Sequence, residues 1–148
     1  MVEPVAISSA VQFSLALAKL CYKISQNISR MQRVDAIVLA LGREIDGLKG
    51  VLDRIQELRN FSNGGIEGPG KQHLQNVEWS LGQCRETLGK LELIFLKLSN
   101  VKGSTFRPWK HAKLTWKAEE ISEFRQEITE SRHRIELDLM MITWYQRY

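Results

Sequence analysis

The stretch from Leu74 to Leu98 is the feature of this sequence that most constrains the fold. Its apolar residues recur at alternating steps of three and four, which places them on one face of an α-helix and argues against a β-strand. A face this regular packs along a straight seam against other helices. The seam consists of Leu74, Val77, Leu81, Cys84, Leu88, Leu91, Phe95 and Leu98. We therefore expect a long helix over residues 71–98.

Three large apolar residues of the same stretch, Trp79, Leu93 and Leu96, fall outside the seam. They either contact another helix of the same bundle or form an exposed patch, and we favour the buried position. The end of the chain raises the same question, because residues 137–145 are apolar on most sides. That segment is either covered by the other helices or belongs to a chain that originally continued.

Helical periodicity also appears over residues 4–28, 33–59 and 116–146. No segment alternates apolar and polar residues with period two for long enough to indicate a sheet. A chain of 148 residues has the size of one domain. The sequence therefore predicts a single all-α domain over residues 1–148, an antiparallel four-helix bundle with a largely buried N-terminal helix.

The second and last of the four predicted helices each have one apolar face and one charged face. The apolar face of the second helix consists of Val34, Ile37, Val38, Leu41, Ile45, Leu48, Leu52, Ile55 and Leu58. The apolar face of the last helix consists of Ile121, Phe124, Ile128, Ile135, Leu139 and Ile142, with Ser131 as its polar exception. We expect both faces to lie in the core.

Three glycines, Gly42, Gly47 and Gly50, lie inside the second predicted helix. A glycine in a helix interior lowers stability by about 1 kcal/mol relative to alanine, so each requires a reason. Close contact with another helix is the interpretation that we favour. Local softness, useful in a domain that must open, is the alternative.

No charged side chain occurs between Pro4 and Ala18. The polar residues of this first predicted helix fall at steps of three and four, with Ala16 filling the one gap, so they form one narrow stripe on an otherwise largely apolar surface. A helix with so wide an apolar arc needs several neighbouring helices or lipid. We therefore expect it to be the central helix of the bundle. The polar stripe consists of Ser8, Gln12, Lys19, Lys23, Gln26 and Arg30.

The flanks and the length of this uncharged stretch argue against a secretion signal and against a permanent membrane span. A signal opens with positive charge and ends at a small-residue cleavage site, whereas this chain opens with Glu3 and continues past Lys19 as a helix. As a helix, Pro4 to Ala18 extends about 22 Å, against about 30 Å of bilayer hydrocarbon. Extension to Tyr22 gives about 28 Å if the Lys19 amine reaches the headgroups. These lengths favour conditional insertion.

The sequence predicts no enzyme, no cofactor and no metal site. Its histidines stand far apart, and neither an HExxH motif nor paired CxxC spacing occurs. The glycine-rich loop over residues 60–70 follows no strand and precedes no Lys-Ser/Thr pair, so it is not a phosphate loop. Cys21 and Cys84 both lie in apolar patterns, which favours reduced, packed thiols and an intracellular protein.

A basic, aromatic segment joins the third and last predicted helices. Cations beside indole rings suit an anionic lipid surface or a single-stranded nucleic acid, and a solvated connector whose tryptophans pack on the bundle end is the other interpretation. We expect no nucleic acid, because no helix presents a basic stripe. Contacts with anionic lipids are predicted for Lys102, Arg107, Trp109, Lys110, Lys113, Trp116 and Lys117.

Three segments resemble fungal HeLo-like domains, the N-terminal domains of many fungal NLR-type (STAND) and ankyrin-repeat proteins. The family's start of Met, a small residue, Glu-Pro and an uncharged helix ending in Lys resembles the opening MVEPVAISSAVQFSLALAKLCYKI. The family's second helix is similar to VLALGREIDGLKGVLDRI, and its last helix is similar to LTWKAEEISEFRQEITESRHRIELDL. The resemblance covers almost the whole chain.

The resemblance implies the four-helix bundle of immune cell-death effectors, held inactive until it oligomerises, exposes its first helix and permeabilises the plasma membrane. The chain would then be the N-terminal signalling domain of a fungal immune-type receptor, acting in programmed cell death, innate immunity or heterokaryon incompatibility. It would be cytoplasmic and move to the plasma membrane on activation. Its expected partners are other copies of itself, anionic lipids, and a downstream sensor domain or cognate signalling protein. The alternative is a non-enzymatic protein–protein adaptor without membrane activity.

Insertion into a membrane would use the apolar residues of the first helix. These are Val5, Ile7, Val11, Phe13, Leu15, Leu17 and Leu20. We expect them to be sheltered in the bundle at rest and to face lipid after activation.

Overall fold

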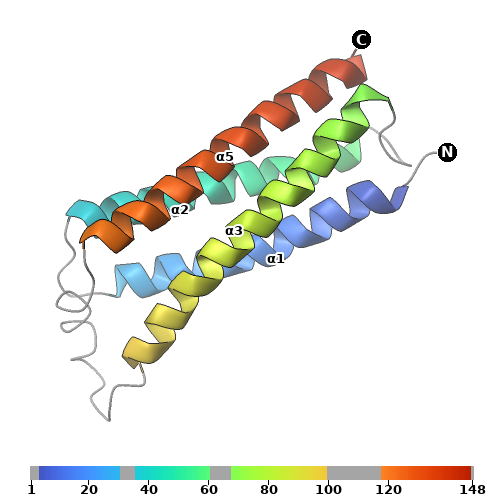
Figure 1. Ribbon diagram of the computed structural model, residues 1–148. Helices are drawn as coiled ribbons and strands as arrows, with labels where there is room; N and C mark the ends of the chain where they lie inside the picture. The colour runs from blue at the N-terminus through green and yellow to red at the C-terminus, as the bar shows by residue number, and fades with distance from the viewer. Residues whose placement is uncertain (1–3, 31–35, 61–67, 100–117, 148) are drawn as a thin grey trace.

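The computed structural model describes residues 4–30, 36–60, 68–99 and 118–147. This part of the chain contains four long α-helices and no strand (Figure 1). The helices are α1 (Pro4–Ser29), α2 (Ala36–Gln56), α3 (Pro69–Ser99) and α5 (Ala118–Arg147), and a short 3-10 helix, η1 (Glu57–Asn60), continues α2. The predicted all-α four-helix bundle is confirmed.

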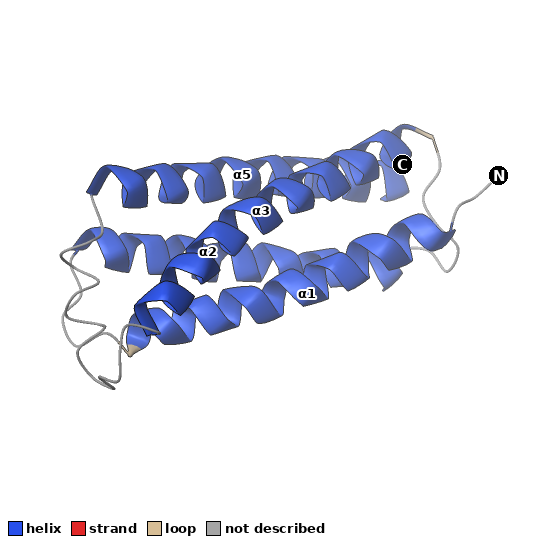
Figure 2. Ribbon diagram, turned by 60° about the horizontal axis from the view of Figure 1, so that its bottom comes forward, coloured by secondary structure: helices blue, strands red, loops and turns tan. Residues whose placement is uncertain are grey.

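Helices that follow each other in the chain run in opposite directions, as predicted (Figures 1 and 2). Some helices that are neighbours in space nevertheless run in the same direction. α1 packs against α2 and α3, and α5 packs against the same two helices. The described parts of α1 and α5 therefore lie on one diagonal of the bundle, and those of α2 and α3 lie on the other. As a result, the neighbouring pairs α1–α3 and α2–α5 run parallel.

The expectation that the first helix is central is wrong, because α1 contacts two long helices rather than three. A helix between two neighbours buries the face turned toward them and leaves the opposite side in water. That outer side includes Leu15, which is 39% exposed, together with Gln12 and Lys19 of the predicted polar stripe. The buried inner face consists of Ala10, Val11, Ser14, Leu17, Cys21, Ile24 and Ile28.

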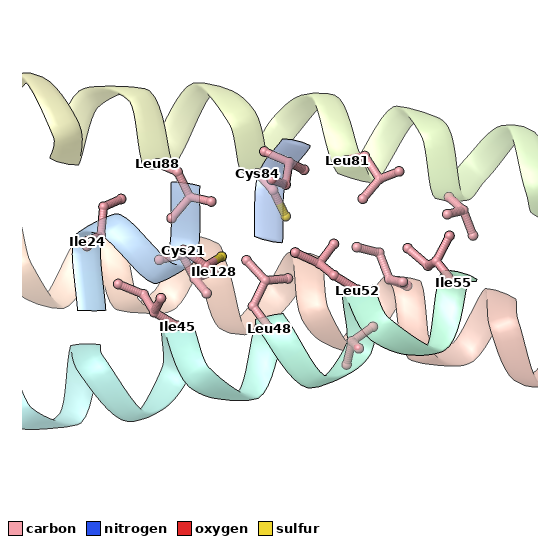
Figure 3. Close-up of a cluster of buried hydrophobic side chains, with 14 of the residues drawn as sticks. Cys21, Ile24, Ile45, Leu48, Leu52, Ile55, Leu81, Cys84, Leu88 and Ile128 are labelled. Carbon is pink, nitrogen blue, oxygen red and sulfur yellow. The ribbon is translucent and has the colours of Figure 1, made fainter. Parts of the chain in front are cut away.

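The hydrophobic core lies along the axis between the four helices (Figure 3). Every described side chain of the α3 seam, from Leu74 to Phe95, is buried. The described members of the predicted α2 and α5 faces are buried as well, except that Phe124 is half-buried and Ile37 is exposed. Ile37 lies in the first turn of α2, where the bundle ends. Each fully buried aliphatic side chain stabilises the fold by about 1.5–3 kcal/mol.

The prediction that the apolar residues outside the α3 seam meet another helix is wrong. Trp79, Leu93 and Leu96 each expose half or more of their surface. The reason is that α3 packs against α1 and α5, and no other described helix covers its third side. Near the end of α5, Leu137 and Met140 are exposed for the same reason, so that apolar segment is not fully covered either.

The glycines of α2 do not mark close helix contacts, so that interpretation is wrong. A methyl group at Gly50 would have no atom of another element within 4 Å, and one at Gly42 would lie 3.7 Å from Ile28. At Gly47 the nearest atom belongs to the Arg132 side chain at 3.4 Å, an ordinary van der Waals contact. Alanine therefore fits at all three positions, and each glycine weakens α2 by about 1 kcal/mol.

The Gly50→Ala substitution should raise the free energy of unfolding by about 0.5–1 kcal/mol, because its methyl group enters open space and alanine restricts the unfolded chain. Urea denaturation followed by circular dichroism measures the change. Gly68→Ala is the matched control, since Gly68 has a backbone φ of 68°, which alanine adopts only with strain. A Gly50→Ala protein that is less stable than the wild type would show that α2 requires a glycine there.

Candidate functional site

The membrane-facing residues predicted on α1 are spread around the helix. Val11 and Leu17 are buried in the core, whereas Leu15 is exposed on the outer side. Phe13 and Leu20 are half-buried and pack against the edge of the core. In the bundle these five residues therefore do not form one surface, and lipid could reach all of them only after α1 separates from α2 and α3.

The other predicted site residues lie outside the described side chains. Val5 and Ile7 belong to the start of α1, but their side chains are not among those described. The predicted lipid contacts fall within residues 100–117, which lie outside the described residues: Lys102, Arg107, Trp109, Lys110, Lys113, Trp116 and Lys117. The candidate site within the described residues therefore consists of α1 and the helices that hold it.

The described polar contacts between α1 and its neighbours lie at the surface. Ser25 donates a hydrogen bond of 2.8 Å to Asp46 of α2. The Lys23 amine lies 3.3 Å from the Glu92 carboxylate of α3, and 70% of the lysine side chain is exposed. Exposed pairs of this kind contribute about 0–1 kcal/mol each. They cannot be the main force that holds α1.

Apolar burial holds α1 in place. Four buried aliphatic side chains, Val11, Leu17, Ile24 and Ile28, together contribute about 6–12 kcal/mol. That is comparable with the whole stability of a typical domain, about 5–15 kcal/mol. The buried Ser14 hydroxyl donates to the Val11 carbonyl of its own helix at 2.8 Å. α1 therefore stays docked unless another apolar environment replaces the core.

α5 also buries an apolar face in the core, but in addition it makes partly buried polar contacts with both of its neighbours. On the α2 side, Arg132 donates hydrogen bonds of 2.7 and 3.0 Å to Glu44, and one of 3.1 Å to Glu136 within α5. On the α3 side, His73 lies 2.8 Å from the Asp138 carboxylate. Hydrogen bonds to charged groups contribute about 1.5–3 kcal/mol each. Separation of α5 would leave these groups without their partners.

The environment of Glu44 makes its contribution depend on pH. Burial raises the pKa of the Glu44 carboxyl, but the hydrogen bonds and the positive charge of Arg132 outweigh burial and hold it below its usual value. Because the folded pKa is lowered, the carboxylate stabilises the fold above its unfolded pKa of about 4.3. This contribution is lost as the pH falls through the folded pKa.

Helical periodicity does not reveal these polar contacts. His73 and Asp138 are 65 residues apart, and Arg132 and Glu44 are 88 residues apart, so each pairing depends on how two helices are aligned. The signal that the sequence does contain is Asp138 itself, a carboxylate inside an otherwise apolar run. Such a residue indicates a partner in a neighbouring helix but does not identify it.

Cys21 and Cys84 are free and buried, as predicted. Burial raises the pKa of the Cys21 thiol to about 12 and that of the Cys84 thiol to about 11. Both thiols are therefore protonated at neutral pH and are poor nucleophiles. Across the described residues, no group of three or more His, Cys, Asp or Glu side chains is placed to hold a metal ion. None of the described helices is both long enough and apolar enough to cross a membrane.

The Glu44→Gln substitution should lower the free energy of unfolding at pH 7 by about 1–3 kcal/mol, because Arg132 loses its charged acceptor. The difference from the wild type should shrink below about pH 4, where the wild-type carboxyl also becomes protonated. Urea unfolding at pH 7, 5 and 3 measures it. Glu92→Gln is the matched control. It removes only the exposed pair with Lys23, so it should lower the free energy of unfolding by less than about 1 kcal/mol. Equal losses in the two variants would show that the Glu44 pair is no stronger than a surface contact.

One protein family, described as pigment biosynthesis cluster protein PigL N-terminal, has a sequence model that matches residues 2–147. The match spans α1, α2, α3 and α5. No curated protein and no solved structure gives a significant match to the chain. Because the family match covers nearly the whole chain, this protein belongs to the PigL N-terminal family.

Proposed function

We propose that the chain is a non-enzymatic, HeLo-like N-terminal effector domain that acts by moving α1 from the bundle into a membrane. Two findings support this class of function. The family to which the chain belongs is described as an N-terminal domain, and the fold is the four-helix bundle that the HeLo-like resemblance implies. The mechanism is supported by the way α1 is held, through apolar burial and exposed polar contacts.

Lipid can replace what the core provides to α1. Bilayer hydrocarbon is as apolar as a protein core, so Val11, Leu17 and Ile24 lose little on transfer between the two. The Ser14 hydroxyl keeps its hydrogen bond, because the acceptor lies in the same helix. α5, by contrast, would leave behind the partner of Arg132. Of these two helices, α1 is the one that exchanges core for lipid at the lower energetic cost.

One side of α1 is unsuited to lipid, and this supports action as an oligomer. Gln12, Lys19 and Lys23 are exposed in the bundle and lie on one stripe. A charged side chain at the centre of a bilayer costs about 2.5–3.5 kcal/mol on insertion scales. Several copies together can turn these stripes toward one another or toward water. Lys19 and Lys23 lie in the second half of α1, where long side chains can extend toward the headgroups.

In this proposal the domain is cytoplasmic at rest, with α1 docked. A downstream sensor domain or a cognate signalling protein triggers association with other copies. The assembled domains then move to the plasma membrane, where basic residues between positions 102 and 117 contact anionic lipids. The outcome is regulated cell death of the kind expected in fungal immunity.

Leu15 borders the polar stripe of α1 without belonging to it, so its side chain meets lipid when the stripe faces another copy or water. It therefore offers a substitution that distinguishes the bundle from the membrane state. Because Leu15 is already 39% exposed, Leu15→Asp should change the urea midpoint only slightly. In lipid the same carboxylate costs about 2.5–3.5 kcal/mol, so dye leakage from anionic vesicles, caused by protein forced to oligomerise, should fall at least about tenfold. Leu93→Asp, on the exposed side of α3, is the control and should cause as much dye leakage as the wild type. Full leakage from Leu15→Asp would contradict the entry of α1 into lipid.

The same assay with a reversible cross-link tests whether α1 must leave α2. The Ser25 and Asp46 side chains are in hydrogen-bond contact, so cysteines at both positions are placed to form a disulfide. The oxidised Ser25→Cys, Asp46→Cys protein should release no dye, and reduction should restore release. Ser25→Ala with Asp46→Ala controls for the lost hydrogen bond. Release by the oxidised protein would show that α1 acts without separating from α2.

A protein–protein adaptor without membrane activity is the second candidate. It is favoured by the exposed side chains of Trp79, Leu93 and Leu96 on α3, which place large apolar surface on a side of that helix that no other described helix covers. An adaptor should self-associate or capture a partner without lipid, and light scattering should show association that Trp79→Ala weakens. It should not float with anionic vesicles. Flotation that depends on an intact α1 would rule against the adaptor.

A further inference from the structure

A groove of about 680 Å³ runs along the exposed face of α5, and Arg54 of α2 borders it. Its apolar wall consists of Leu137, Met140 and Trp144, which follow one another at steps of three and four and each expose more than half of their surface. This stripe lies on one face of α5 and extends about 10 Å along it. The volume is within the usual range of small-molecule sites, about 300–1,000 Å³.

Two side chains that line the same groove have N–H groups available to donate further hydrogen bonds. Within the described chain, Arg54 has one charged contact, 3.6 Å from Glu136, and makes no hydrogen bond. The exposed side chain of His133 also makes none among the described residues. Glu136, the acid of the groove, already accepts a hydrogen bond of 3.1 Å from Arg132. The groove therefore presents spare N–H donors beside an apolar wall.

We propose that this groove binds a single-chain amphiphile with an anionic head group, namely a medium-chain fatty acid. A carboxylate matches the planar N–H fork of Arg54 and accepts charge-assisted hydrogen bonds from it, and the ring N–H of His133 is a second donor. The acyl chain lies along the apolar wall and removes exposed carbon from water. The site contains no residue of α1, so it does not depend on the function proposed for that helix.

A fatty acid fits this groove better than a helix from a second copy does. An apolar helix face would cover Leu137 and Met140 but would bury the Arg54 guanidinium with no acceptor other than the Glu136 carboxylate 3.6 Å away, which is unfavourable. A cationic amphiphile lacks an acceptor, and a neutral alcohol accepts only an uncharged, weaker hydrogen bond than a carboxylate does. The polar side of the groove therefore selects the head group.

Sodium dodecanoate, below its micelle concentration, is the probe, titrated into the full chain by isothermal calorimetry. We expect saturable binding of about one molecule per chain, because the groove has one Arg54 guanidinium to hold a head group. Met140→Glu should abolish binding, because it places a carboxylate on the apolar wall. Arg54→Gln should weaken dodecanoate binding at least about fivefold and leave dodecanol binding unchanged. Met140 is 59% exposed, so its replacement should leave the fold intact, which urea unfolding verifies.

Leu93→Glu is the matched control, because Leu93 is 58% exposed and lies on α3, away from the groove. This variant should bind dodecanoate like the wild type. Equal affinity for dodecanoate, dodecanol and dodecyltrimethylammonium would overturn the proposal, and so would a loss in Leu93→Glu as large as that in Met140→Glu. The groove would instead be assigned to a second copy if dodecanoate did not bind and the wild type sedimented as a dimer while Met140→Glu sedimented as a monomer.

Discussion

Each long helix of this bundle packs against two other long helices, and the other features of the described structure depend on this constraint. A helix in that position buries one arc of its surface, and any apolar residue outside the arc reaches water. α1, α3 and α5 all have apolar residues beyond this arc, as Leu15, Trp79 and Met140 show. The exposed apolar surface is therefore a direct result of a sequence pattern that is wider than the packing can cover, and it is where contacts with other molecules are to be sought.

The two ways of holding a helix divide the bundle into unequal parts. Apolar contacts such as those of Leu17 and Ile24 tolerate small shifts and are satisfied by any apolar surroundings. The hydrogen bonds of Arg132 and Asp138 require defined donors and acceptors at defined distances. α5 therefore sets the alignment of α2 and α3, whereas the polar contacts of α1 with Asp46 and Glu92 lie at the surface. A division of this kind is suited to a domain in which one helix is to leave and three are to remain.

Helical periodicity predicts the elements of this fold well and their arrangement poorly. The α3 seam can be recognised because burial of one face is a local property that repeats with every turn. Which helices become neighbours is not a local property. For that reason periodicity alone wrongly places α1 at the centre of the bundle, and Trp79 and Leu93 between helices. The glycines illustrate the same limit, since the open space beside Gly50 depends on where the other helices lie.

For the candidate site, the sequence shows the uncharged length of α1 but not the angle at which it docks. That angle decides that Val11 is buried and Leu15 is exposed. The contact of Arg132 with Glu44 depends on the parallel alignment of α2 and α5, which no pattern within either helix encodes. The groove beside Arg54 depends on the same alignment, so neither feature is predictable from periodicity or composition alone.

The parallel neighbours have a consequence for how the molecule assembles. α1 with α2, and α3 with α5, form two antiparallel hairpins from segments that follow each other in the chain, whereas the parallel pairs join the hairpins side by side (Figure 2). Contacts close in sequence form quickly, and those that join distant segments form later. The link between Arg132 and Glu44 joins the two hairpins and is expected to form after the rate-limiting step. Its strength then governs how long the native state survives rather than how fast it is reached.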